Sequence, residues 1–292
     1  MRILIVIAFL SPLLHLAAQN SDGLNILHIT SAHTSFPDTA RAKGHLYKNV
    51  LYDAATHYQD STVLIITPIH LDAMKKVDII FWFHGWGNNV DSAAIRYGLT
   101  SQFGASHLNA VLVLAETTYD APDSYGGKLE NRDVFKELVN DVLVKLRKEK
   151  LIGRKCMPRN ILLAGHSGAY RVMASILQIG GLPIKETILF DALYAETGKY
   201  LDWIKEDTKH RFINIYTDNG GTDEETNNML KSLKIEGITY NTINEASLNS
   251  QMIRENRILI IHSLRKHNDI INQPDNFELF IENSPFLKKQ KR

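Results

Sequence analysis

The sequence contains almost no cysteine: Cys156 stands alone among 292 residues. A single cysteine cannot close an internal disulfide, so the folded chain depends on its core for stability in any redox compartment. An excess of charge of one sign is lacking too, because 33 Lys and Arg residues oppose 32 Asp and Glu residues and the net charge is +1. Binding of nucleic acid or of an anionic membrane surface relies on such an excess, and we expect neither partner.

Metal-binding spacings are also lacking. The 12 histidines include no pair in an H-x-H or H-E-x-x-H arrangement, so we expect no metal site. We find no internal repeat, no low-complexity tract and no linker rich in Pro and Ser. A chain of this length with 44% apolar residues can bury one large core. We therefore predict a single domain over residues 19–292.

Long apolar runs are lacking except at the beginning of the chain. The segment MRILIVIAFLSPLLHLAA has a positive charge at Arg2, an apolar stretch interrupted by Ser11 and Pro12, and small residues at Ala17 and Ala18. This combination is typical of a cleavable secretory signal peptide, and the apolar part is too broken for a good membrane-spanning helix. We predict a signal peptide over residues 1–18 and a secreted or periplasmic protein with no stable membrane insertion after cleavage.

Apolar, β-branched runs alternate with segments of helical periodicity along the rest of the chain, which is typical of α/β proteins. Strands are predicted for eight runs, at 24–30, 62–69, 77–83, 110–116, 160–165, 187–193, 212–217 and 257–263. Helices are predicted for five segments, at 91–103, 133–150, 169–181, 199–207 and 225–237. Several strands are apolar throughout, as expected where helices cover both faces. The predicted fold class is α/β, with a doubly wound, mostly parallel sheet of about eight strands flanked by helices.

A tight turn joins a buried-type strand to a helix in the segment ILLAGHSGAYR, residues 161–171. Gly165 and Ala169 stand two positions before and after Ser167, and Gly168 follows the serine directly. This is the G-x-S-x-G pattern of a nucleophile elbow with alanine in place of the last glycine. Such a turn needs small residues because the chain packs closely around a strained serine. A serine at a helix start is otherwise a common N-cap, but the strand, turn and helix context favours Ser167 as a nucleophile.

A second motif, HGWG from His84 to Gly87, ends the third predicted strand. An HG loop after the third core strand together with a GHSGA elbow after the fifth resembles the α/β-hydrolase superfamily, and the order of elements is similar over nearly the whole chain after residue 18. The resemblance implies a serine hydrolase that needs no cofactor. It also implies that the backbone amides of Trp86 and Gly168 form an oxyanion hole, and that an acid and then a histidine follow the serine in the chain.

Two histidines are candidates for the general base in RILIIHSLRKHNDIIN, residues 257–272. His262 continues the apolar alternation of the last strand, which favours a half-buried structural residue. His267 lies in the polar loop beyond that strand, from which a side chain can reach Ser167 across the edge of the sheet. We predict His267 as the base.

Two aspartates are candidates for the acid that orients the histidine. Asp218 follows the seventh predicted strand, the usual acid position in the superfamily, and Asp191 follows the sixth, which some members use. Either aspartate can instead be a turn former or a structural residue. The prediction favours Asp218 narrowly and keeps Asp191 as the alternative.

The segment 116–133, ETTYDAPDSYGGKLENRD, is long, contains aromatic and glycine residues, and lacks periodicity. Functional loops commonly have this composition. The segment follows the fourth predicted strand and could place Tyr119 and Tyr125 over Ser167 as substrate-binding residues, although an exposed loop without a role fits equally well. No long insertion follows the sixth strand, so we expect an open site without a large cap domain.

The predicted function is an exported serine hydrolase in which Ser167 attacks an ester or amide carbonyl. Esters are favoured because an alcohol leaves more easily than an amine, and the acyl group could belong to a small molecule or be carried on a polymer. The alternative is a non-catalytic binding protein of the cell envelope that keeps the same fold. The presence of a serine, a histidine, an acid and an HG loop together favours the enzyme.

Overall fold

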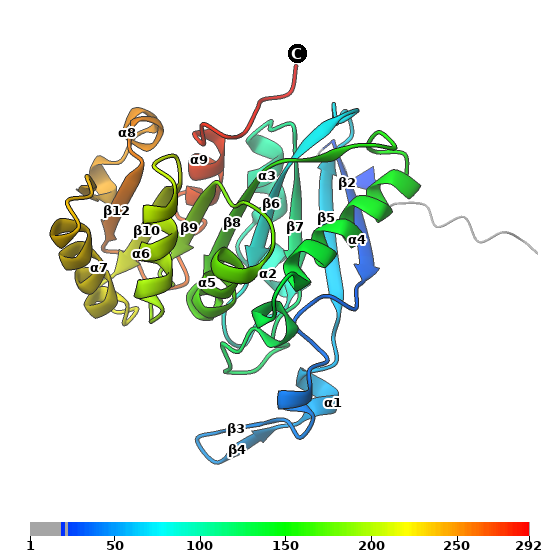
Figure 1. Cartoon of the computed structure of the whole chain (residues 1–292), viewed down its shortest axis with the longest axis horizontal. Coiled ribbons are helices and arrows are strands. Elements are labelled where there is room, and N and C mark those ends of the chain that lie inside the picture. Colours follow the sequence, from blue (N-terminus) through cyan, green and yellow to red (C-terminus); the bar gives the residue numbers. More distant parts are fainter. Residues whose placement is uncertain (1–18, 21–22, 292) are drawn as a thin grey trace, which may run out of the picture.

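The structure is a computed structural model that describes residues 19–20 and 23–291, and the predicted signal peptide, residues 1–18, lies outside the described residues. Its centre is a ten-stranded sheet (Figure 1) with the order β1-β2-β5-β7-β6-β8-β9-β10-β12-β11. Neighbouring strands from β7 to β11 in this order are parallel, whereas β1, β2 and β5 form antiparallel pairs. The strands are β1 (Gln19–Asn20), β2 (Leu24–Thr30), β5 (Thr62–Pro68), β6 (Lys76–Phe83), β7 (Ala110–Ala115), β8 (Met157–His166), β9 (Glu186–Phe190), β10 (Arg211–Thr217), β11 (Asn241–Asn244) and β12 (Ile258–Ser263).

Helices cover both faces of this sheet (Figure 1). Residues of α4, α5, α6 and α7 belong to the apolar core on one face, and residues of α2, α3, α8 and α9 belong to the core on the other. The helices are α1 (Ala54–His57), α2 (Val90–Arg96), α3 (Leu99–Ala105), α4 (Val134–Lys148), α5 (Tyr170–Ile179), α6 (Thr197–Glu206), α7 (Asp223–Ile235), α8 (Ser250–Glu255) and α9 (Asn276–Glu282). The predicted fold class is confirmed, and the described residues form no large cap domain over the sheet.

Strand β6 shows why the central strands carry apolar residues at successive positions. Ile79, Phe81 and Phe83 belong to one core, Ile80 and Trp82 belong to the other, and all five are buried. Successive side chains of a strand point to opposite faces, so a strand covered on both sides must be apolar at odd and even positions. All eight predicted strands are present, and within the described residues the sheet gains only the short strands β1 and β11, which have no apolar run.

The structure differs from the predicted pattern in several places, among them the additional helices α1, α8 and α9. The helix predicted at 91–103 is divided into α2 and α3, because Gly98 between them has a φ of 59°, a left-handed conformation that interrupts a helix. The chain also forms a β-hairpin of β3 (His45–Tyr47) and β4 (Val50–Tyr52), a separate two-stranded sheet that projects from the body (Figure 1). Its turn residues Lys48 and Asn49 both have positive φ, as in the turns that favour hairpins.

Two remaining features of the described residues concern the single cysteine and the character of the helices. Cys156 is a free, buried thiol in the core beneath α4. None of the helices in the described part of the chain has the length and apolar character needed to cross a membrane.

Candidate active site

Ser167 occupies a strained turn between β8 and α5. Strand β8 ends at His166, a short 3₁₀ turn spans Ser167–Ala169, and α5 begins at Tyr170. The φ of Ser167 is 54°, a left-handed conformation that costs a residue with a side chain about 1–3 kcal/mol. A Cβ on Gly165 would lie only 2.7 Å from the Cβ of Ala169, so the turn requires glycine there. The serine is therefore held in the backbone geometry of a nucleophile elbow.

The loop that follows β6 lies directly against this elbow, because β6 and β8 are parallel neighbours. A Cβ on Gly85 would lie 2.6 Å from the Cβ of Ser167 and 3.2 Å from the backbone nitrogen of Gly168. The two loops can approach so closely only because Gly85 has no side chain. Among the backbone hydrogen bonds of the described loops, none uses the amide of Trp86 as its donor. The amides of Trp86 and Gly168, predicted as oxyanion donors, thus belong to two loops that meet at Ser167.

His267 is paired with Asp191. Nδ1 of His267 lies 2.7 Å from Oδ2 of Asp191, and the imidazole is one-quarter exposed whereas the carboxylate is fully buried. Asp191 directly follows β9, and His267 lies in the loop after β12. The imidazole ring also packs against the ring of His166, with 4.4 Å between the ring centroids. Because His166 precedes Ser167 in the chain, this packing places the base beside the elbow.

The loop after β10 holds the carboxylate of Asp191. The carboxylate accepts hydrogen bonds from the Thr217 hydroxyl at 2.6 Å, from the Thr217 amide at 3.2 Å and from the Thr222 hydroxyl. A Cβ on Gly220 would overlap the carboxylate, so the loop can close over it only with glycine there. Burial raises the pKa of Asp191, but hydrogen bonds from His267, Thr217 and Thr222 lower it by more, and the pKa lies below its ordinary value.

Asp218 makes a different contact. Its Oδ1 lies 2.5 Å from Nε2 of His262, and its side chain is 56% exposed. The structure therefore does not bring the favoured Asp218 to His267: the aspartate that contacts His267 is the alternative, Asp191. The physical reason lies in the end of β10 and the loop behind it: Thr217 and Thr222 donate hydrogen bonds to Asp191, whereas Asp218 turns outward to His262 on the neighbouring strand β12. His262 is partly buried and bound to Asp218, as expected of a structural residue.

Ser167 and Tyr194 line the same cavity. Among the hydrogen bonds of the described residues, none joins Ser167 to His267, and the Tyr194 hydroxyl donates to the Gly220 carbonyl at 2.5 Å. Burial and the charge of Asp191 raise the pKa of Tyr194 to about 12, against a smaller opposite effect of the Ser167 side chain. Tyr194 is therefore a neutral phenol at physiological pH. A nucleophile and its base often reach hydrogen-bonding distance only when substrate is bound.

A cavity of about 240 Å³ opens beside the serine. Its lining consists of Trp86, Ser124, Ser167, Gly168, Tyr170 and Tyr194. The indole N–H of Trp86 donates to the Ser124 hydroxyl at 2.7 Å, and a Cβ on Gly168 would lie 2.6 Å from the same indole. The indole of Trp86 is thus fixed by its hydrogen bond to Ser124 and by its close packing against Gly168. Within the described residues, no group of three or more His, Cys, Asp or Glu side chains is placed to hold a metal ion.

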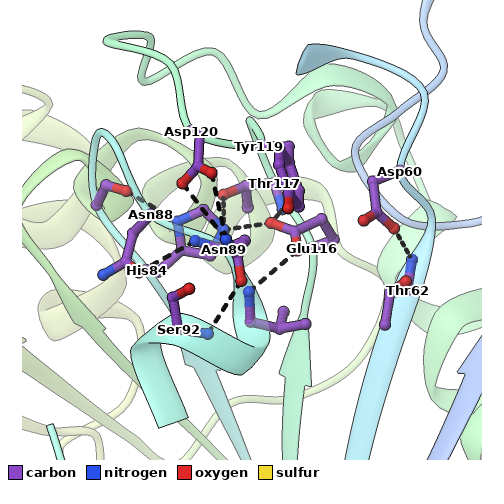
Figure 2. Close-up of polar contacts among 12 residues, drawn as sticks. Asp60, Thr62, His84, Asn88, Asn89, Ser92, Glu116, Thr117, Tyr119 and Asp120 are labelled. Carbon is purple, nitrogen blue, oxygen red and sulfur yellow. Dashed lines mark hydrogen bonds and ion pairs between the residues drawn. The ribbon is translucent and has the colours of Figure 1, made fainter. Parts of the chain in front are cut away.

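Tyr119 and Tyr125 do not line this cavity, which corrects their expected position over the serine. The hydroxyl of Tyr125 donates to Asp38 at 3.1 Å, and its ring packs edge-on against Phe36. Tyr119 lies beside Glu116 and Thr117, which follow β7 (Figure 2). The loop 116–133 does reach the cavity, but through Ser124. Composition indicated a functional loop here and could not indicate which of its side chains turn toward the site.

His166 is a residue of the site that no sequence pattern indicated, since it fills the variable position of the G-x-S-x-G turn. Its Nε2 lies 3.0 Å from the backbone carbonyl oxygen of His267, and the Tyr97 hydroxyl lies 3.2 Å from its Nδ1. Burial, with the charge of His267, lowers the pKa of His166 to about 3. His166 is therefore neutral, and its Nε2–H donates to the backbone of the loop that carries the base.

Comparisons with known proteins find a similarity of fold. No family model matches the sequence, and no curated protein sequence matches it. Among solved structures, the fluorophosphonate-binding serine hydrolase F of Staphylococcus aureus superposes with a TM-score of 0.52 at 11% identity, over 89% of this chain and 98% of its own. An S-formylglutathione hydrolase of Agrobacterium tumefaciens superposes with a TM-score of 0.53 at 9% identity, over 92% of this chain and 98% of its own. A mutant of the feruloyl esterase module of Clostridium thermocellum, complexed with sinapinate, superposes with a TM-score of 0.52 at 11% identity, over 94% of this chain and 93% of its own. The chain thus has the α/β fold of these serine hydrolases and esterases over most of its length.

The neutral state of His166 predicts a loss of stability in mild acid. The pKa is about 3 in the folded chain and about 6.5 in the unfolded chain, so the unfolded state binds the proton more readily. The stabilisation is complete above about pH 6.5 and is lost as the pH falls toward 3. Between pH 7 and pH 5 the free energy of unfolding should fall by about 2 kcal/mol from this group.

Urea unfolding of wild-type protein and of His166→Asn at the two pH values measures this contribution. The variant should show a smaller decrease than the wild type, and His262→Asn, which keeps His166, should show the wild-type decrease. An equal decrease in wild type and His166→Asn would contradict a neutral His166 in the folded protein.

Proposed function

We propose that this protein is an exported serine hydrolase that cleaves esters through an acyl-enzyme on Ser167, with His267 as general base and Asp191 as the orienting acid. The observation that carries the proposal is the 2.7 Å contact between Nδ1 of His267 and the buried carboxylate of Asp191, next to a serine in a strained turn. A carboxylate on Nδ1 leaves Nε2 to take up a proton, as in Ser-His-Asp triads. The structures of similar fold include a serine hydrolase and a feruloyl esterase, which supports this class of reaction.

In the first half of the reaction, the hydroxyl oxygen of Ser167 attacks the ester carbonyl carbon while Nε2 of His267 takes the hydroxyl proton. The carbonyl oxygen becomes an oxyanion, to which the backbone amides of Trp86 and Gly168 donate hydrogen bonds. The bond to the alcohol oxygen then breaks, and His267 returns its proton to the alcohol. Water attacks the acyl-enzyme in the same way, which releases the acid and restores Ser167. The reaction needs no cofactor.

The buried charge of Asp191 is required because His267 becomes an imidazolium in each half of this reaction. The carboxylate stabilises that cation and fixes the tautomer in which Nδ1 carries a hydrogen. Three hydrogen bonds from Thr217 and Thr222 keep Asp191 ionised and immobile. A non-catalytic binding protein with this fold would have no need for a buried, ionised carboxylate against a partly exposed imidazole, and this favours the enzyme over that alternative.

The triad predicts different effects for three substitutions. Ser167→Ala should abolish labelling by a fluorophosphonate and lower kcat by about 10⁴-fold to 10⁶-fold. Asp191→Asn preserves the shape of the acid without its charge and should lower kcat by about 10⁴-fold. The matched control is Asp218→Asn, which removes the charge of the exposed aspartate bound to His262 and should leave kcat unchanged. Hydrolysis of 4-nitrophenyl acetate and detection of the labelled protein measure these effects.

Three results would contradict the triad. Labelling of Ser167→Ala at the wild-type rate would exclude Ser167 as the nucleophile. If folded Asp218→Asn loses kcat while folded Asp191→Asn keeps it, the orienting acid is Asp218, which follows β10. A folded wild-type protein that neither hydrolyses activated esters nor reacts with the fluorophosphonate would favour the non-catalytic alternative.

The cavity beside Ser167 indicates an aromatic acyl group as part of the proposal. Trp86, Tyr170 and Tyr194 form its walls, and aromatic walls bind a planar ring through stacked and edge-on contacts. The cavity is lined by both residues that carry the proposed oxyanion donors and not by His267, which has to face the departing alcohol. The acyl side of the ester therefore enters it. About 240 Å³ is smaller than a drug-sized pocket of roughly 300–1,000 Å³, so one ring fits better than a long chain.

This cavity predicts a preference for 4-nitrophenyl 3-phenylpropanoate over 4-nitrophenyl octanoate. The kcat/KM ratio of the two esters should favour the aromatic acyl group by about tenfold, because each ring contact adds about 0.5–1.5 kcal/mol beyond area burial. Tyr170→Ala should remove most of this preference, whereas Tyr119→Ala, outside the cavity, should keep it. A wild-type preference for the octanoate would show that the cavity does not take the ring.

Export belongs to the proposal on the strength of residues 1–18, which combine Arg2, an apolar stretch and the pair Ala17 and Ala18. Expression in a bacterial host should yield a periplasmic or extracellular protein whose intact mass lacks about 18 residues. A control in which Ala17 and Ala18 are both replaced by Leu should accumulate uncleaved precursor. An exported wild-type protein that retains Met1 would identify the segment as an anchor instead.

A further inference from the structure

An ion pair without access to solvent lies directly behind the HGWG loop. Nε2 of His84, at the end of β6, lies 2.5 Å from Oε1 of Glu116, at the end of β7, and the two side chains are 2% and 0% exposed. The other carboxylate oxygen, Oε2, accepts the backbone N–H of Val90 at 3.0 Å. Figure 2 shows the pair inside a network with Asn88, Asn89 and Thr117. Neither His84 nor Glu116 has a part in the proposed reaction so far.

Both ring nitrogens of His84 face acceptors. Nδ1 lies 2.8 Å from the carbonyl oxygen of Gly85, which can only accept, so Nδ1 carries a hydrogen. Nε2 faces the carboxylate of Glu116. Burial lowers the pKa of His84, but the charge of Glu116 and the hydrogen bonds to Glu116 and Gly85 raise it by more, and the net shift is upward. The upward shift of this pKa favours the imidazolium form of His84, for which the carboxylate of Glu116 is the counter-ion.

The Gly85 carbonyl belongs to the same peptide unit as the amide of Trp86. A trans peptide is planar, and its C=O and N–H point in opposite directions. A donor that fixes the direction of the Gly85 carbonyl therefore also fixes the direction of the Trp86 N–H. This peptide lies against the elbow, since a Cβ on Gly85 would be 2.6 Å from the Cβ of Ser167.

We propose that His84 and Glu116 are positioning residues, which hold the Gly85–Trp86 peptide so that the Trp86 N–H points at the developing oxyanion. Glu116 acts through His84, and His84 acts through the Gly85 carbonyl. A loop peptide without this hold could rotate and turn the N–H away, which would remove one donor from the oxyanion hole. The inference rests on the proposed function, because it assigns these residues to the transition state of that reaction.

A pair of substitutions at His84 separates this role from a structural one. Asn places an amide N–H close to the position of Nδ1, so His84→Asn can still donate to Gly85, whereas His84→Gln carries its amide one bond further out and cannot. Both variants lose the ion pair equally. His84→Gln should lower kcat by about 100-fold, the cost of one oxyanion donor, with little change in KM. His84→Asn should keep kcat within about tenfold of the wild type.

The affinity for a boronic acid, which forms a tetrahedral adduct with the serine, reports on the oxyanion hole directly. It should fall in parallel with kcat in the two His84 variants and in Glu116→Gln. If the unpaired Glu116 prevents folding, both His84 variants are measured on the Glu116→Gln background, which removes the uncompensated charge. Urea unfolding of each variant records the loss of stability separately.

The matched control is Asp78→Asn. Asp78 lies on the same strand β6, is fully buried, and is paired with Arg159, but it sits near the start of the strand rather than at the elbow. This variant should lose stability without a change in kcat or in boronic acid affinity. The inference is overturned if folded His84→Gln keeps the wild-type kcat and boronic acid affinity, or if His84→Asn and His84→Gln lose activity equally. Failure of the proposed function has a different signature, namely a wild-type protein that has no activity and no fluorophosphonate labelling.

Discussion

The parallel pairing of β6 with β8 is the constraint on which the site depends. The register places Phe83 opposite Gly165, so the chain leaves both strands at the same edge of the sheet and the two following loops must share the same space. They can do so because Gly85 and Gly168 have no side chains where the loops meet. This close approach brings Trp86, Ser167 and Gly168 together at one cavity.

The other half of the site is assembled from strands on the far side of β8. Asp191 comes from the end of β9, its hydrogen-bond donors come from β10 and the loop behind it, and His267 comes from the loop after β12. Each element contributes one group at the carboxyl edge of the parallel sheet, where ligands bind in open α/β folds. The carboxylate is desolvated but supplied with several hydrogen bonds, which is how a buried charge is kept ionised.

Two buried histidines at the ends of neighbouring strands illustrate how partners decide a charge state. His166, on β8, faces a carbonyl oxygen and a hydroxyl, and burial leaves it neutral with a pKa of about 3. His84, directly after β6, is equally buried but contacts the carboxylate of Glu116, which outweighs desolvation and raises the pKa of His84. In the proposed mechanism the neutral histidine holds the loop of the base, and the charged one holds the loop of the oxyanion donor.

The sequence by itself determined the elements of this protein and the position of its elbow. Apolar runs covered on both faces, helical periodicity and small residues around Ser167 are local signals, because strand burial, helix amphipathicity and turn strain depend on residues close together in the chain.

The tertiary structure decided which distant side chains meet. Asp191 and Asp218 both follow strands, and only the folded loop around Gly220, which closes over Asp191, shows that Asp191 reaches His267. The same holds for Ser124, Tyr170 and Tyr194, which line the cavity in place of Tyr119 and Tyr125, since the direction in which a loop turns its side chains is set by contacts across the fold.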